Sequence, residues 1–217
     1  NTGEQAFIRE NLSAPRPGVN PDTGMPILRK SCVNGVPDAF CSINTDRNTR
    51  AANRFINMFL LEFNHSGQIA SILLQLITLD HTRLIYQPAN ESNFLIFYYL
   101  LFGCSDAALK SDLQLDSTQI NGTTTDETDR NLFFSSTFST TDLEKSSRIH
   151  FQHIMGAFDV LNIKESEVKA IFSLLASIVL LGKAGAVSAS TNSRFGQFKL
   201  PNEAHKVASL LGVSFQQ

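Results

Sequence analysis

The stretch that decides the fold opens as QIASILLQLIT (residues 68–78) and closes as ESNFLIFYYLL (residues 91–101). The first part is apolar at most positions, which is typical of a strand buried on both faces. The second part places apolar side chains at spacings of three and four, which predicts a helix that starts near Pro88 and ends at Gly103. A buried strand followed by an apolar helix favours an α/β fold.

A second apolar run lies just upstream of this stretch. It reads FINMFLLEF (residues 55–63), and the turn Asn64-His65-Ser66-Gly67 separates it from the strand at 68–78. Two such runs joined by a short turn with a glycine predict an antiparallel hairpin. Because both runs are apolar on both faces, we expect the hairpin to be buried inside a larger sheet.

The remainder of the chain has the pattern of helices. Helices are predicted over Leu143–Leu161, over Glu165–Leu181 with Gly182 as its end, and over Pro201–Leu211 with Gly212 as its end. The helix over 165–181 is apolar nearly all round and is expected to be buried. We expect Leu161 and Leu211 to face the core.

Composition limits the class of protein. The 217 residues are 42% hydrophobic and 18% charged, which is typical of a globular chain. The net charge of −2 gives no support to a nucleic-acid partner. Three cysteines form no disulfide framework and indicate a reducing, cytoplasmic compartment, with Cys41 and Cys104 expected as buried thiols. The longest apolar run, Ile171–Leu181, is too short to span a membrane.

The order of these segments resembles the part of a myosin motor domain that follows switch I. The joint LDHTRLI (79–85) is similar to the myosin "LLEKSRV", and ESNFLIFYYLL (91–101) is similar to "ERNFHIFYxLL". FDVLNI (158–163) with ESE (165–167) resembles "AMxxLGFSxEE", and IFSLLASIVLLG (171–182) resembles "IFxILAAILHLG". Lys183–Val187, GQIAS (67–71) and Pro88-Ala89 are most similar to class XVIII unconventional myosins.

The resemblance implies a P-loop NTPase-type motor with α/β architecture. Residues 1–37 are rich in proline and glycine and are expected to be irregular, whereas residues 38–217 are expected to hold switch I, transducer strands and upper 50-kDa helices. No GxxxxGK[ST] loop and no "DxxGFE" switch II occurs in the sequence. The resemblance therefore implies a part of a motor domain between those two motifs, in a parent that binds actin filaments, ATP or ADP with Mg²⁺, and dimerises through a coiled-coil tail.

Switch I in this family has a pattern like NxNSSRFG, in which the serines reach the metal and the γ-phosphate. Aligned on Arg54-Phe55, the two serines fall on Ala52 and Asn53. Mg²⁺ prefers oxygen ligands, and an alanine offers none in its side chain. Thr49, Ala52, Asn53 and Arg54 are expected to line the nucleotide site, with no catalytic residue and no metal ligand assigned. We call residues 51–55 the switch I segment.

These substitutions favour an actin tether with weak or absent ATPase activity in the cytoskeleton. Two alternatives stay open. In the first, the parent is an actin-activated ATPase, and loop residues 47–50 replace the lost contacts. In the second, the chain is a non-motor helical module for protein interaction.

Three further features have structural interpretations. NSRFGQF (192–198) is closer to switch I letter by letter, but a helix rather than a strand pattern follows it, which favours a surface loop. Glu91 is expected to cap the helix that follows it. His150 and His153 could pair on a metal, but with no cysteine or carboxylate at a suitable spacing they are assigned to a helix surface.

Overall fold

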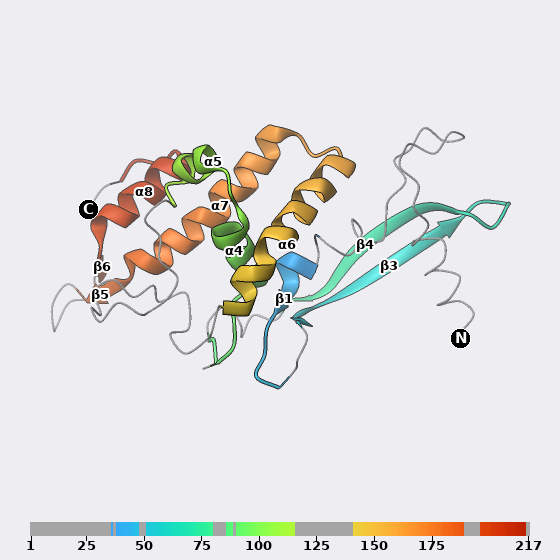
Figure 1. The fold of residues 1–217 in the computed structure, drawn as a ribbon, viewed down its shortest axis with the longest axis horizontal. Coiled ribbons are helices and arrows are strands. Elements are labelled where there is room, and N and C mark those ends of the chain that lie inside the picture. Colours follow the sequence, from blue (N-terminus) through green and yellow to red (C-terminus); the bar gives the residue numbers. More distant parts are fainter. Residues whose placement is uncertain are drawn as a thin grey trace.

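The computed structural model of the chain describes residues 36, 38–47, 51–79, 86–88, 90–115, 141–188 and 196–215 (Figure 1). The predictions for residues 1–35, for the joint at 80–85 and for Thr49 lie outside these residues. The strands are β1 (Ser42–Ile43), β2 (Ala52–Asn53), β3 (Phe55–Phe63), β4 (Ile69–Leu79), β5 (Ala186–Ser188) and β6 (Gly196–Phe198). The helices are α4 (Leu95–Tyr98), the π-helix η1 (Tyr99–Gly103), α5 (Ala107–Asp112), α6 (Thr141–Val160), α7 (Glu165–Ala184) and α8 (Pro201–Leu211). No helix of the described residues is long and apolar enough to cross a membrane.

The predicted hairpin is confirmed: β3 and β4 pair antiparallel from Phe55 opposite Leu79 to Phe63 opposite Ile69. Its turn is stabilised by the Asn64 side chain, whose Oδ1 accepts the backbone N–H groups of Ser66 at 3.0 Å and Gln68 at 2.9 Å. Figure 1 shows the hairpin as a long arm that extends away from the helices.

The larger sheet expected around this hairpin does not form within the described residues, where β3 and β4 pair only with each other and their apolar faces stay open. Ile56 is 58% exposed and Leu73 is 60% exposed, and other apolar side chains of both strands are also open to solvent. The apolar pattern predicts which surface favours burial. A two-stranded hairpin cannot bury that surface without further strands or helices packed on it. Contact with the helices is made at the base, where the ring of Phe55 stacks on Phe94 with centroids 5.9 Å apart.

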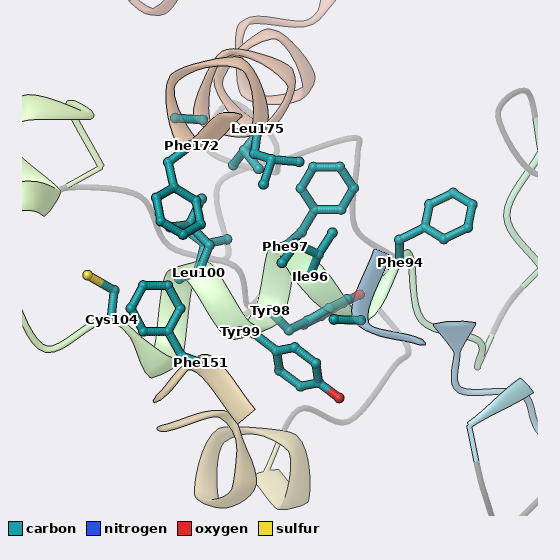
Figure 2. Packing of buried hydrophobic residues seen from close by; sticks show 14 of the residues in the cluster. Phe94, Ile96, Phe97, Tyr98, Tyr99, Leu100, Cys104, Phe151, Phe172 and Leu175 are labelled. Carbon is teal, nitrogen blue, oxygen red and sulfur yellow. The ribbon is translucent and has the colours of Figure 1, made fainter. Parts of the chain in front are cut away.

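The core forms around α4 and η1. All residues from Phe94 to Leu101 are buried, because this short helical segment lies between other elements rather than on a surface. Figure 2 shows Phe172 and Leu175 of α7 packing on one side of it and Phe151 of α6 on another. The predicted helix exists and includes Gly103 as its last residue, but its second half is a π-helix.

This helix begins at Leu95 and not near Pro88, the start that the apolar pattern predicts. Asn90 has a positive φ of 62°, which interrupts any helix that would start before it. Asn93 then turns its side chain back, and its Oδ1 accepts the N–H of Phe94 at 2.7 Å. The local side-chain hydrogen bond replaces a further helical turn.

The two long helices are confirmed with changes at their ends. α6 ends at Val160, so Leu161 lies beyond the helix and is 40% exposed, against the prediction that it faces the core. α7 continues through Gly182 and ends at Ala184, and Gly185, whose φ is +57°, caps it. A glycine ends a helix where the backbone takes a positive φ, and that occurs at the second glycine here.

The last helix, α8, has the predicted bounds, with Pro201 in its first turn and Gly212 in a left-handed conformation with φ +66°. Val207 is buried, but Leu211 is 46% exposed, contrary to prediction. Strands β5 and β6 were not predicted, and they pair antiparallel between α7 and α8. Gly196–Phe198, part of the segment that resembles switch I, therefore does form a strand, although the rest of that motif lies outside the described residues.

A largely buried cluster of ion pairs joins α7 to α8. The Glu203 carboxylate lies 3.3 Å from Lys183 Nζ and 3.1 Å from Lys206 Nζ, and its side chain is 11% exposed. Loss of the Glu203 carboxylate would leave the ammonium groups of Lys183 and Lys206 close to each other and partly shielded from water. We expect Glu203→Gln to lower the free energy of unfolding by about 1–3 kcal/mol. Urea unfolding of the chain measures it.

The matched control is Asp159→Asn on the exposed face of α6. We expect a change within about 0.5 kcal/mol there. Equal effects of the two variants would show that the cluster is no more than a solvated surface pair.

Candidate functional site

The switch I segment is attached to the core through a small sheet that the sequence pattern did not predict. β1 and β2 pair antiparallel, with Ser42 opposite Asn53 and Ile43 opposite Ala52. The backbone N–H of Arg54 donates to the carbonyl oxygen of Cys41 at 2.8 Å. Ile43 is fully buried in the core, so the sheet has a fixed base.

The oxygen of the Asn53 side-chain amide is engaged in a hydrogen bond. Its Oδ1 accepts the backbone N–H of Phe55 at 2.9 Å. Asn53 also lowers the pKa of Asp38, which lies in the helical turn that ends at Cys41. Asn53 therefore links the β1–β2 pair to the start of β3.

Asp38 influences the ionisable groups around it. Desolvation raises the pKa of its own carboxyl, and the hydrogen bond from Asn53 acts in the opposite direction. Burial, with the negative charge of Asp38 as the second cause, raises the pKa of the Cys41 thiol to about 11 and that of Tyr99 to about 12. Both groups are thus neutral at physiological pH.

A pair of hydrogen bonds joins the end of β1 to the loop before α4. The N–H of Asn44 donates to Ser92 Oγ at 2.7 Å, and the N–H of Ser92 donates to the carbonyl of Asn44 at 3.0 Å. One residue further on, the N–H of Asn93 donates to the hydroxyl of Tyr98 at 3.1 Å. Ser92 and Tyr98 are both fully buried, so these bonds are shielded from water.

The structure brings together Ala52, Asn53 and Arg54 of the predicted site residues, on β2 and directly after it. Thr49 lies outside the described residues. Ala52 is half-buried and carries only a methyl group, and the Asn53 carbonyl oxygen already accepts a hydrogen bond. The side chains of these residues do not fit the oxygen ligation that Mg²⁺ requires.

Several residues that shape the site were missed in the sequence. Ser92 and Asn93 directly precede an apolar helical run, which is a recognisable signal of residues that bond the backbone at a helix start. Glu91, the residue predicted to cap this helix, lies three positions before the N-cap Phe94 and outside the helix.

The remaining candidates take structural positions. The ring of His150 stacks on Tyr99 with centroids 4.8 Å apart, and it meets His153 edge-on at 6.4 Å. Burial against this surface, and the charge of His153, lower the pKa of His150. Within the described ranges, no group of three or more His, Cys, Asp or Glu residues could hold a metal ion. Cys41 and Cys104 are buried free thiols, as predicted.

The raised pKa values of Cys41 and Tyr99 predict a loss of stability in alkali. In the folded chain these groups hold their protons up to pH values of about 11 and 12, against usual values of 9.0 and 10.0. Their contribution is complete below about pH 9 and falls as the pH rises through the folded pKa values. We expect the urea midpoint to fall between pH 8 and about pH 11.

The control for this pH effect is the double variant Cys41→Ala/Tyr99→Phe, which removes both titrating groups. The urea midpoint of the double variant should be lower at pH 8 and should change less between pH 8 and about pH 11. An identical decline in both proteins would assign the alkaline loss to other groups, such as lysines.

Comparison with known sequences gives a family match over most of the chain. The family described as "Myosin head (motor domain)" matches residues 27–217. The chain is 34% identical over 167 residues to unconventional myosin-XVIIIa of Mus musculus, with 77% of this chain and 8% of the relative covered. It is 32% identical over 179 residues to unconventional myosin-XVIIIb of Homo sapiens, with 82% and 6% covered.

A relative from another myosin class matches at similar identity. The chain is 32% identical over 184 residues to the non-muscle myosin-2 heavy chain of Acanthamoeba castellanii, with 83% of this chain and 11% of the relative covered. The chain thus spans at most 11% of the length of these three relatives.

Proposed function

This chain belongs to the myosin head (motor domain) family, and from this premise we propose that it is part of an actin-binding motor domain whose ATPase activity is weak or absent. In this proposal residues 38–217 carry switch I, transducer strands and upper 50-kDa helices of a P-loop NTPase-type motor. The parent protein binds actin filaments in the cytoplasm and dimerises through a tail. Its nucleotide is ATP or ADP with Mg²⁺.

The observation that carries the proposal is the state of the switch I segment. Ala52 has no side-chain oxygen, and the amide oxygen of Asn53 accepts the backbone N–H of Phe55. Phosphoryl transfer depends on positioning and on stabilisation of charge, with little covalent chemistry by the protein. A motor without these hydroxyl contacts stabilises the charge that develops in the transition state less well, and its turnover rate is therefore lower.

The similarity to class XVIII relatives supports the same interpretation. Lys183–Val187, GQIAS (67–71) and Pro88-Ala89 carry this similarity in the sequence, and the two class XVIII proteins match at 34% and 32% identity. The exposed apolar faces of β3 and β4 support a position within a larger sheet, since such faces are stable when other strands or helices cover them.

A working actin-activated ATPase is the second candidate. The retained Arg54 favours it, because an arginine at this position can still pair with an acid of the closing site. The similarity to a non-muscle myosin-2 heavy chain also favours it. The third alternative, a purely helical module, does not agree with the long β3–β4 hairpin or with membership of the motor family.

The deciding experiment measures phosphate release and actin co-sedimentation by the motor domain that contains this chain. We expect co-sedimentation with actin filaments and turnover at least about 10²-fold below that of a motor with both serines, because oriented contacts of this kind are each worth about 10²–10³ in rate. Phosphate release that rises strongly with actin would overturn the tether proposal and leave the working ATPase.

The variant Ala52→Ser/Asn53→Ser restores both hydroxyl groups in the same background. A gain of turnover in this variant would place the defect in the switch I segment. The matched control is Ser66→Ala in the distant hairpin turn, which should change neither property.

A further inference from the structure

Residues 92–94, which lead into α4, hold the switch I segment at two places. The backbone N–H of Asn44, the residue after β1, donates to Ser92 Oγ at 2.7 Å, and the N–H of Ser92 donates to the carbonyl of Asn44 at 3.0 Å. Phe55, the last residue of the segment, stacks its ring on that of Phe94 with centroids 5.9 Å apart. The strand that pairs with the segment and the end of the segment therefore both rest on one short stretch of chain.

This stretch is itself fixed in the core. Ser92 has no exposed surface, and Phe94 is 8% exposed. The N–H of Asn93, between them, donates to the hydroxyl of Tyr98 at 3.1 Å, and Tyr98 is also fully buried. A hydrogen bond to Ser92 is shielded from water, and breaking it therefore costs more than breaking one at the surface.

The backbone carries the position of Asn44 to Arg54. β1 ends one residue before Asn44 and pairs with β2. The carbonyl oxygen of Cys41, one residue before β1, accepts the N–H of Arg54 at 2.8 Å. The Ser92 hydroxyl therefore holds one end of β1, and Arg54 is bonded at the other end.

The serine at this position departs from the motor pattern. ESNF (91–94) is similar to "ERNF", which has an arginine in place of Ser92. A guanidinium group has donors and no acceptor, so it could not accept the N–H of Asn44. The bond from Asn44 is therefore a property of this serine and not of the pattern.

We propose that Ser92 is a positioning residue whose hydroxyl holds β1, and through β1 the Arg54 of switch I, on the core around α4. This inference rests on the proposed function, since it concerns the switch I segment of that motor. Without the hydroxyl, the N–H of Asn44 loses its partner, and β1 separates from the loop before α4 more often. The population of that separated state should rise about tenfold.

The test is hydrogen–deuterium exchange at the Asn44 and Arg54 amides in the motor domain that contains this chain, without nucleotide. In Ser92→Ala we expect both amides to exchange about tenfold faster than in the natural sequence. The α7 amides report global unfolding and should keep their natural rates. Natural rates at Asn44 and Arg54 would overturn the positioning role, and so would an equal acceleration of the α7 amides, since that shows a general loss of stability.

Ser92→Thr keeps the accepting oxygen and adds a methyl group to a filled site. The methyl group should lower overall stability and speed the α7 amides, whereas the Arg54 amide should stay within about threefold of its natural rate. A role in stability alone predicts the reverse order of the two serine variants. Faster exchange at Arg54 in Ser92→Thr, with natural rates in α7, would overturn the role of the hydroxyl.

Ser177→Ala is the matched control. Ser177 is 1% exposed, and its hydroxyl donates to the Ser173 carbonyl within α7 at 2.8 Å. The variant removes a buried hydroxyl from the same core and should leave the Asn44 and Arg54 amides at their natural rates. Tenfold faster exchange at Arg54 here as well would overturn the assignment to Ser92.

A measurement on the natural protein covers the case in which Ser92→Ala does not fold. The Asn44 amide should exchange at least about 10²-fold more slowly than an amide of an unstructured peptide. Exchange at the unstructured rate would show that Ser92 does not hold Asn44. Actin-stimulated phosphate release would overturn the proposed function alone, because every exchange rate is measured without nucleotide.

Discussion

Gly103→Ala is expected to lower the free energy of unfolding by about 3 kcal/mol or more. A Cβ atom at Gly103 would overlap the carbonyl oxygen of Ser147 and would lie 2.7 Å from Cβ of Phe151. The first of these atoms belongs to the α6 backbone, which cannot move aside as the end of a flexible side chain can. The added methyl group must therefore separate η1 from α6 at the centre of the core. Urea unfolding followed by circular dichroism measures the loss.

Gly156→Ala is the matched control, since Gly156 lies on α6 and a Cβ atom added there would have no atom within 4 Å. Alanine there removes backbone freedom from the unfolded chain and should stabilise the protein by about 0.5–1 kcal/mol. Opposite signs for the two glycines would establish close helix packing at Gly103. A loss of less than about 1 kcal/mol at Gly103 would show that α6 shifts easily and does not pack closely on η1.

Phe172→Ala is expected to cost about 3–5 kcal/mol, the range for removal of a buried aromatic side chain. Phe172 has no exposed surface, and its ring lies 5.5 Å from that of Phe151 and 6.2 Å from that of Phe158. It thus joins α7 to α6 beside the buried segment of α4 and η1 (Figure 2). Alanine would leave a cavity that neighbouring helices can fill only in part. Chemical denaturation gives the magnitude.

Leu174→Ala provides the control on the same helix, because Leu174 is 55% exposed. We expect a change within about 0.5 kcal/mol. The contrast also tests the prediction that α7 is buried all round, which the exposure of Leu174 and Leu181 contradicts in the described chain. A large loss at Leu174 would mean that another surface covers this side of α7.

These core contacts matter for the proposed function because the switch I segment depends on them. β1 begins beside the core, and the Asn44–Ser92 bonds attach it to the loop that leads into α4. A variant that loosens α4 and η1 should therefore loosen the switch I segment as well.

The sequence by itself determined the type and much of the extent of the main elements. Period and turn chemistry predicted the β3–β4 hairpin, α6 and α8, because apolar repeat and turn residues are local properties of a chain. The order of several segments similar to those of a myosin motor also identified the family, and the match over residues 27–217 confirmed it. The predicted helix ends were less accurate, because the sequence does not show which of Gly182 and Gly185 takes the positive φ that ends α7.

Only the tertiary structure decided the surroundings of those elements and the contacts of the site. Whether β3 and β4 are covered depends on which layers pack on them, and the described chain leaves their apolar side chains exposed. The pairing of β1 with β2 and the Asn44–Ser92 bonds join residues separated by loops of different lengths. No local pattern encodes such partners, because each pair forms only when the core brings its two segments together.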